Sequence, residues 1–124
     1  MRMPQEIELW YIIPSIRKEL SIALRELNLT QRDIAKRLEI TEAAISQYLK
    51  DKRAVKVNFN NKIMSEIKNS AKEIINGKNS VNEILKICDL IRSEKVLCEY
   101  HKLYDKDVPK NCEICLKYSY SIAK

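Results

Sequence analysis

Hydrophobic residues recur three and four positions apart along most of this chain, which is the spacing of one face of an α-helix. The pattern is clearest in residues 29–50, LTQRDIAKRLEITEAAISQYLK, where Glu39 and Ile40 separate two short amphipathic stretches. Thr30 and Thr41 stand directly before the two stretches, in the position of residues that cap a helix. The pattern therefore predicts two short helices joined by a tight turn. The hydrophobic residues of their buried sides are Ile34, Ala35, Leu38, Ala44, Ile45, Tyr48 and Leu49.

Two short helices joined in this way form a helix-turn-helix, which is a DNA-reading unit. The turn of this motif commonly has Gly where the chain has Glu39, because the backbone there is left-handed. A residue other than Gly in that conformation costs roughly 1 kcal/mol. The sequence therefore predicts a left-handed backbone at Glu39.

The second helix of the motif is expected to enter the major groove, so its outward residues are candidates for reading bases. Gln47 can pair with adenine, Glu42 can accept from cytosine, and Ala43 can touch a thymine methyl group. Gln31, at the start of the preceding helix, can bind a phosphate. The alternative is a helical hairpin with a solvated polar face, but the basic run at 50–56 favours DNA. The candidate DNA-binding residues are Gln31, Thr41, Glu42, Ala43, Ser46, Gln47, Lys50, Lys52 and Arg53.

Two further hydrophobic stretches precede the motif. Pro14 separates them, and because proline suits the first turn of a helix and not its interior, a break or kink is predicted there. The second stretch ends at Asn28 and is expected to support the DNA-reading helices. The first, residues 6–13 with the only Trp of the chain, either covers this bundle or packs against a second copy. Helix-turn-helix proteins usually bind paired half-sites, so we expect a homodimer.

Two more helices are predicted after the motif, and we interpret them as linker and scaffold. The first runs from about residue 62 to residue 76 and is closed by Gly77. Ser80 opens the second, with Glu83 as its partner in a capping box. The fold class is therefore all-α, with an N-terminal helix-turn-helix bundle, a helical linker and a cysteine-rich, metal- or cluster-binding C-terminal part. The predicted domains are 1–58, for DNA binding, and 59–124, for the linker and sensor.

Composition narrows the function classes. The formal net charge of +6 favours a polyanionic partner, which here is double-stranded operator DNA. No apolar run approaches a membrane span and the N-terminus lacks a signal-peptide pattern, so we expect a cytoplasmic protein without a membrane partner. With one His and no nucleophile–base arrangement beyond the cysteines, neither an enzyme nor a small-molecule substrate is expected.

The four cysteines all lie in the last third of the chain, where thiols of an intracellular protein are more often ligands than disulfides. The two-residue gap between Cys112 and Cys115 lets both thiolates point at one centre. Two ligand sets remain open. An iron–sulfur cluster suits the four cysteine thiolates of Cys88, Cys98, Cys112 and Cys115. A tetrahedral zinc suits Cys98, His101, Cys112 and Cys115, and leaves Cys88 as a buried helix residue.

The chain resembles a family of XRE-like archaeal transcriptional regulators of the SUF-like type in four segments: IELWYIIPSIR, TQRDIAKRLEITEAAISQYL, KICDLIRSEKVLCEYH and NCEIC. This family pairs a repressor-type helix-turn-helix with a C-terminal cysteine cluster. The resemblance implies an iron–sulfur cluster, 4Fe-4S or 3Fe-4S, and control of iron–sulfur cluster assembly genes. The ligands it implies are Cys88, Cys98, Cys112 and Cys115.

These observations predict a sequence-specific DNA-binding transcriptional regulator that senses redox state, oxygen or iron availability through the cluster. The first alternative is a helix-turn-helix regulator with a structural Cys3His zinc site. The second is an iron–sulfur carrier or small redox protein whose helical part docks a partner. Steep salt dependence of duplex binding distinguishes the regulators from the carrier.

Overall fold

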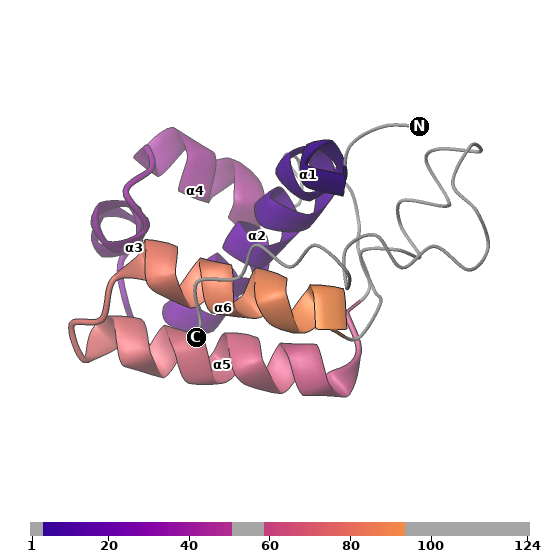
Figure 1. The fold of residues 1–124 in the computed structure, drawn as a ribbon. Coiled ribbons are helices and arrows are strands. Elements are labelled where there is room, and N and C mark those ends of the chain that lie inside the picture. The colour runs from indigo at the N-terminus through magenta and orange to yellow at the C-terminus, as the bar shows by residue number, and fades with distance from the viewer. Residues whose placement is uncertain (1–3, 51–58, 94–124) are drawn as a thin grey trace.

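The computed structural model describes residues 4–50 and 59–93, and within them every regular element is helical (Figure 1). The all-α prediction is therefore confirmed for this part of the chain. In chain order the elements are α1 (Pro4–Ile7), the π-helical turn η1 (Glu8–Ile12), α2 (Ile13–Glu26), α3 (Gln31–Leu38), α4 (Glu42–Leu49), α5 (Asn61–Ile75) and α6 (Ser80–Ser93).

The first three elements form one uninterrupted helical run that passes through Pro14. Of the break or kink predicted at that proline, the break is absent, and the helix is instead irregular directly before Pro14. The backbone N–H of Ile13 donates to the carbonyl oxygen of Glu8, five residues earlier, which is the bonding pattern of a π-helix. Pro14 then occupies the first turn of α2, where its missing N–H costs least.

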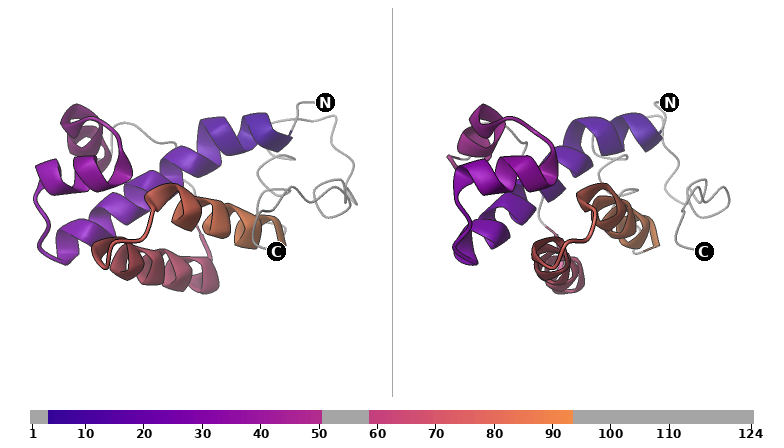
Figure 2. Two further views of the ribbon diagram at one scale, coloured as in Figure 1. Left: turned by 60° about the vertical axis from the view of Figure 1, so that its left-hand side comes forward. Right: turned by 90° about the vertical axis from the view of Figure 1, so that its left-hand side faces the viewer.

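α2 is the central element of the bundle. It contacts α3, α4, α5 and α6. Figure 2 shows the pair α3 and α4 on one side of α2 and the pair α5 and α6 on the other. The two helices α3 and α4 are therefore held on α2, which is itself packed against α5 and α6.

One hydrophobic core joins all of these helices. It contains Leu20 and Leu24 of α2, Ile34 of α3, Ile67 of α5 and Ile87 of α6, all at most 1% exposed. The helices predicted as linker and scaffold are thus part of the same bundle as α3 and α4. The predicted domain division at residue 58 falls between elements that share this core, and residues 94–124 of the predicted sensor lie outside the described residues.

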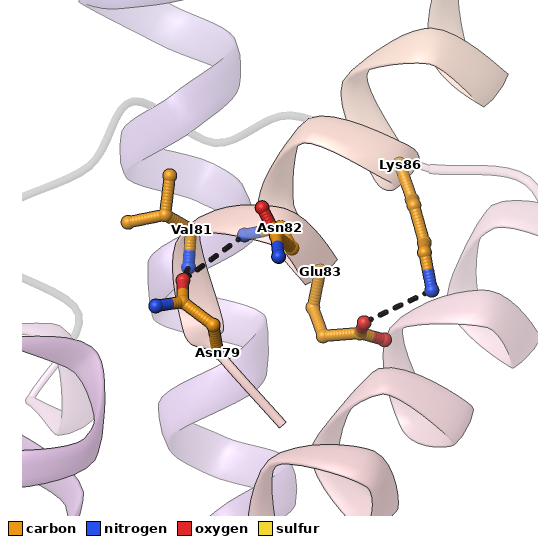
Figure 3. A network of polar contacts seen from close by, with 5 residues as sticks. All are labelled: Asn79, Val81, Asn82, Glu83 and Lys86. Carbon is orange, nitrogen blue, oxygen red and sulfur yellow. Dashed lines mark hydrogen bonds and ion pairs between the residues drawn. The ribbon is translucent and has the colours of Figure 1, made fainter. Parts of the chain in front are cut away.

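The starts of the last two helices are set by asparagines. Asn60 accepts a hydrogen bond from the N–H of Ile63 at 2.9 Å and opens α5 within a residue of the predicted position. At α6, Asn79 Oδ1 accepts from the N–H groups of Val81 at 2.8 Å and Asn82 at 3.3 Å (Figure 3). The predicted capping box that begins at Ser80 is therefore wrong by one residue.

The acidic residue of the predicted capping box has another partner. The carboxylate of Glu83 accepts from Lys86 Nζ at 3.1 Å, one helical turn ahead (Figure 3). Asparagine caps a helix as well as serine does. Of the two adjacent candidates, Asn79 is the one whose side-chain oxygen meets the free N–H groups of the first turn.

Candidate nucleic-acid interface

The helix-turn-helix is built by the local interactions that its sequence predicts. Thr30 Oγ1 accepts from the N–H of Asp33 at 3.2 Å, and Thr41 Oγ1 accepts from the N–H of Ala44 at 3.1 Å. Both hydroxyls satisfy backbone donors that the first helical turn leaves without a partner. Glu39 has φ 58° and ψ 40°, so the predicted left-handed backbone is confirmed.

The turn is closed by the backbone of its own residues. The left-handed residue Glu39 lets the N–H of Ile40 reach back to the carbonyl oxygen of Ala35 at 3.1 Å. Ala35 of α3 is buried, 6% exposed, and α3 packs against α4. The relative position of the two helices is therefore fixed at the point where α3 ends.

α4 divides into a buried side and an outward side. Ala44, Ile45 and Tyr48 are at most 5% exposed and face the bundle. Five predicted DNA-binding residues are exposed: Thr41, Glu42, Ala43, Gln47 and Lys50. Ser46 and, at the start of α3, Gln31 are half-buried. The remaining two, Lys52 and Arg53, lie outside the described residues.

This arrangement brings most of the predicted DNA-binding residues to one end of the bundle. α4 presents hydroxyl, carboxylate, methyl and amide groups along an accessible side, which is the mixture that base edges in the major groove require. The N-terminus of α3, where Gln31 stands, adds backbone N–H groups and a positive helix dipole. Contact of these residues with DNA remains a prediction.

One basic residue of α3 has a role that the sequence did not suggest. Arg37 Nη1 donates to the carbonyl oxygen of Ile74 at 2.8 Å and to that of Ile75 at 3.5 Å, both in the last turn of α5. The partners are 37 and 38 residues away, so no local pattern announces the contact. The only feature of the sequence that could have indicated this contact is the basic residue in the last turn of a short helix.

The cysteine prediction falls largely on the undescribed part of the chain. Cys98, His101, Cys112 and Cys115 lie outside the described residues. Cys88 lies on α6 with a free thiol, is 2% exposed, and belongs to the hydrophobic core. In residues 4–50 and 59–93, no group of three or more His, Cys, Asp or Glu side chains is placed to hold a metal ion.

The surroundings of Cys88 keep its thiol protonated. Burial, with a smaller contribution from the negative charge of Glu8, raises the pKa of the Cys88 thiol from 9.0 to about 12. A metal ligand must be a thiolate that can reach the metal. Because binding of a metal lowers the pKa of its thiol ligands, the value for the metal-free protein leaves both ligand sets open as predictions.

A buried ion pair lies beside this thiol. Arg92 Nη1 on α6 donates to Glu8 Oε1 on η1 at 2.8 Å, with the two side chains 5% and 8% exposed. Asp89 approaches Arg92 Nη2 at 3.5 Å. The paired residues are 84 positions apart, so sequence reasoning could not connect them. They join the first helical run to the end of α6.

Comparison with known families identifies the motif. Residues 20–59 match the family described as Helix-turn-helix, and the match covers the end of α2 together with α3 and α4. It supports a DNA-binding transcription regulator and carries no information on the cysteines. No curated protein and no solved structure matches the chain. Among the described helices, none combines the length and the apolar character needed to cross a membrane.

Proposed function

We propose that this protein is a sequence-specific transcriptional regulator that places α4 in the major groove of double-stranded operator DNA. The observation that carries this proposal is the two-sided character of α4. One side is anchored in the core, while the other presents exposed polar groups at the end of a helix-turn-helix. Phosphate contacts from the N-terminus of α3 and from Lys52 and Arg53 would fix the register of the helix on the duplex.

Selection of bound sequences from a random duplex library tests this function. We expect a recovered consensus, preferred over random duplex by at least about a thousandfold, with an affinity that falls steeply as salt rises. Arg53→Ala should reduce the slope of log K against log salt by about 1, while Lys68→Ala, on the exposed side of α5, should leave it unchanged. Recovery of no consensus, with salt-insensitive binding, would instead favour the carrier hypothesis.

The C-terminal segment is proposed to hold a metal centre that adjusts DNA binding. The resemblance to the SUF-like archaeal regulators supports an iron–sulfur cluster, 4Fe-4S or 3Fe-4S, on the four cysteines. Such a centre would supply redox sensitivity to oxygen or iron availability. The burial of Cys88 supports the other candidate, a zinc held by Cys98, His101, Cys112 and Cys115, which would stabilise the segment without sensing.

Metal analysis of protein purified without oxygen distinguishes the two centres. An iron–sulfur cluster predicts brown protein with about four irons and an equal amount of sulfide per chain. The colour, the iron and the sulfide should all be lost in the Cys88→Ala variant. A zinc site predicts colourless protein with about one zinc per chain. The Cys88→Ala variant should retain the zinc, and the Cys112→Ser variant should lose it. If loaded and metal-free protein bind the selected operator equally well at fixed salt, the sensing role is wrong.

The protein is further proposed to bind DNA as a homodimer. Leu9 and Trp10 on η1 are 60% and 47% exposed, and two adjacent large hydrophobic side chains with that exposure suit a contact with a second copy. Sedimentation equilibrium of wild type and of a Leu9→Ser, Trp10→Ser variant tests this. A dimer that the variant dissociates supports the proposal, whereas a wild-type monomer on a single half-site contradicts it.

A further inference from the structure

The contact between Arg37 and α5 joins the helix-turn-helix to the part of the bundle behind it. α3 lies beside the turn between α5 and α6, and Arg37 stands in its last turn (Figures 1 and 2). Its guanidinium binds the carbonyl oxygens of Ile74 and Ile75. The last carbonyls of a helix have no partner within the helix and carry partial negative charge, and that of Ile74 also accepts from the N–H of Gly77 at 3.1 Å. A guanidinium is therefore well matched to this position, both as a donor and as a cation.

The far side of this contact is firmly held. Ile63, Ile67 and Ile74 of α5 are at most 1% exposed, so α5 is anchored in the core along its length. α3, in contrast, has only eight residues. Arg37 thus attaches a short helix to a long and well-buried one.

The attachment point lies directly before the DNA-reading helix. Arg37 is followed by Leu38, by the left-handed residue Glu39, and then by the cap of α4 at Thr41. The turn is closed by the bond from Ile40 to Ala35, so α3 and the start of α4 move together. A displacement of the end of α3 would therefore shift the residues that face the bases.

We propose that Arg37 is a positioning residue for DNA reading: through its bonds to the α5 carbonyls it sets the position of α4 without itself contacting DNA. This inference rests on the proposed function. Base contacts must be held within about 0.5 Å of their productive geometry, so the loss of a remote support weakens specific binding. Non-specific binding depends on phosphate charge and does not need that accuracy.

The obvious alternative is that Arg37, as a cation on a DNA-binding protein, contacts a phosphate. The two roles predict different responses to salt. Removing a phosphate contact lowers the slope of log K against log salt by about 1 and weakens specific and non-specific binding alike. Removing a positioning residue weakens specific binding only and leaves the slope unchanged.

The test compares full-length wild type with Arg37→Met, which keeps an unbranched apolar stem but removes the guanidinium, and with Arg37→Lys. Arg32→Met is the matched control, because Arg32 is an exposed cation on the same helix. Affinity for the selected operator and for random duplex is measured across salt concentrations, with the active fraction fixed by stoichiometric titration. Circular dichroism reports whether each variant is folded.

For Arg37→Met we expect about tenfold weaker operator binding, an unchanged salt slope and unchanged binding to random duplex. Arg37→Lys should recover part of the loss, since an ammonium can bind one carbonyl. Arg32→Met should leave the preference for operator over random duplex unchanged. A lowered slope with equal losses on both duplexes, or no loss at all, would overturn the proposal. A wild type without any operator preference would instead refute the DNA-reading function itself.

Discussion

The outward side of α4 and the surroundings of Cys88 are two regions that the sequence marked as functional, and they differ in access. The α4 candidates include exposed polar side chains such as Gln47, whereas Cys88 is buried. The hydrophobic spacing itself accounts for the difference, because Cys88 lies between Ile84, Ile87 and Ile91 on the buried side of α6. The comparison teaches that position on a helical face is a better guide to access than the chemistry of a single side chain.

The comparison predicts that variants around Cys88 change stability, and the largest effect is expected at the Glu8–Arg92 pair. Arg92→Met removes the guanidinium from beside the buried Glu8 carboxylate, and should lower the free energy of unfolding by about 3–5 kcal/mol. Glu8→Leu should do the same. Urea denaturation measures both. The double variant should recover most of the loss, and a double variant as unstable as the sum of the singles would show that the pair is not coupled.

A variant on the outward side of α4 is expected to change DNA recognition and to leave stability almost unchanged. Gln47→Ala should reduce discrimination at one base pair by roughly 1–3 kcal/mol. The free energy of unfolding should change by no more than about 0.5 kcal/mol, because the side chain is exposed. Operator variants in a binding assay measure the first and urea denaturation the second. A variant that loses stability but keeps its base preference would place Gln47 with the structural residues.

The Cys88 thiol predicts a loss of stability at alkaline pH. Its pKa is 9.0 when unperturbed and about 12 in the folded protein. Below pH 9 the thiol is protonated in both states, and its effect on stability is constant. Above pH 9 the unfolded chain loses the proton first, so unfolding is favoured by about 1.4 kcal/mol for each pH unit up to the folded pKa.

Cys88→Ala isolates this effect from the titration of other groups. The difference in free energy of unfolding between wild type and variant should shrink as the pH rises from 9 to 11. Urea denaturation at a series of pH values measures it. A difference that stays constant over this range would mean that the thiol is accessible in the folded state.

The smallest effect is expected at the turn of the helix-turn-helix. Glu39 has φ 58°. Glu39→Gly should therefore stabilise the protein by at most about 1 kcal/mol, since glycine adopts this backbone without strain but loses more entropy on folding. Thermal unfolding measures the change. Glu39→Ala is the control, because alanine retains the Cβ and should give no such gain.

Much of the fold could be predicted from the sequence because it depends on near neighbours. The caps Thr30 and Thr41 and the left-handed residue Glu39 interact within five residues, and all three predictions are confirmed. At α6 the same reasoning chose Ser80 over Asn79, because two adjacent residues could both serve as caps and only the path of the chain decides between them.

What could not be predicted depends on residues that the sequence separates widely. The partners of Arg37 and Arg92 are brought close only by the packing of α5, α6 and η1. The exposed side of α4 followed from the hydrophobic pattern, whereas the cysteine spacing could not show whether Cys88 reaches a common centre. Shared ligation depends on distances between side chains, and spacing along the chain constrains these only for close neighbours such as Cys112 and Cys115.

The π-helical turn sets the rotational phase of the N-terminal helix. Ile12 and the buried hydrophobic residues of α2 repeat every four positions, but Ile7, also fully buried, lies five positions before Ile12. The wider π-helical turn of η1 accommodates this additional residue. As a result, Glu8 is placed to bind Arg92 while Trp10 remains exposed. If η1 were wound as regular α-helix with the same number of residues, everything before it would be rotated by about 100° about the helix axis. The same side chains would then exchange the interior for the surface without any substitution.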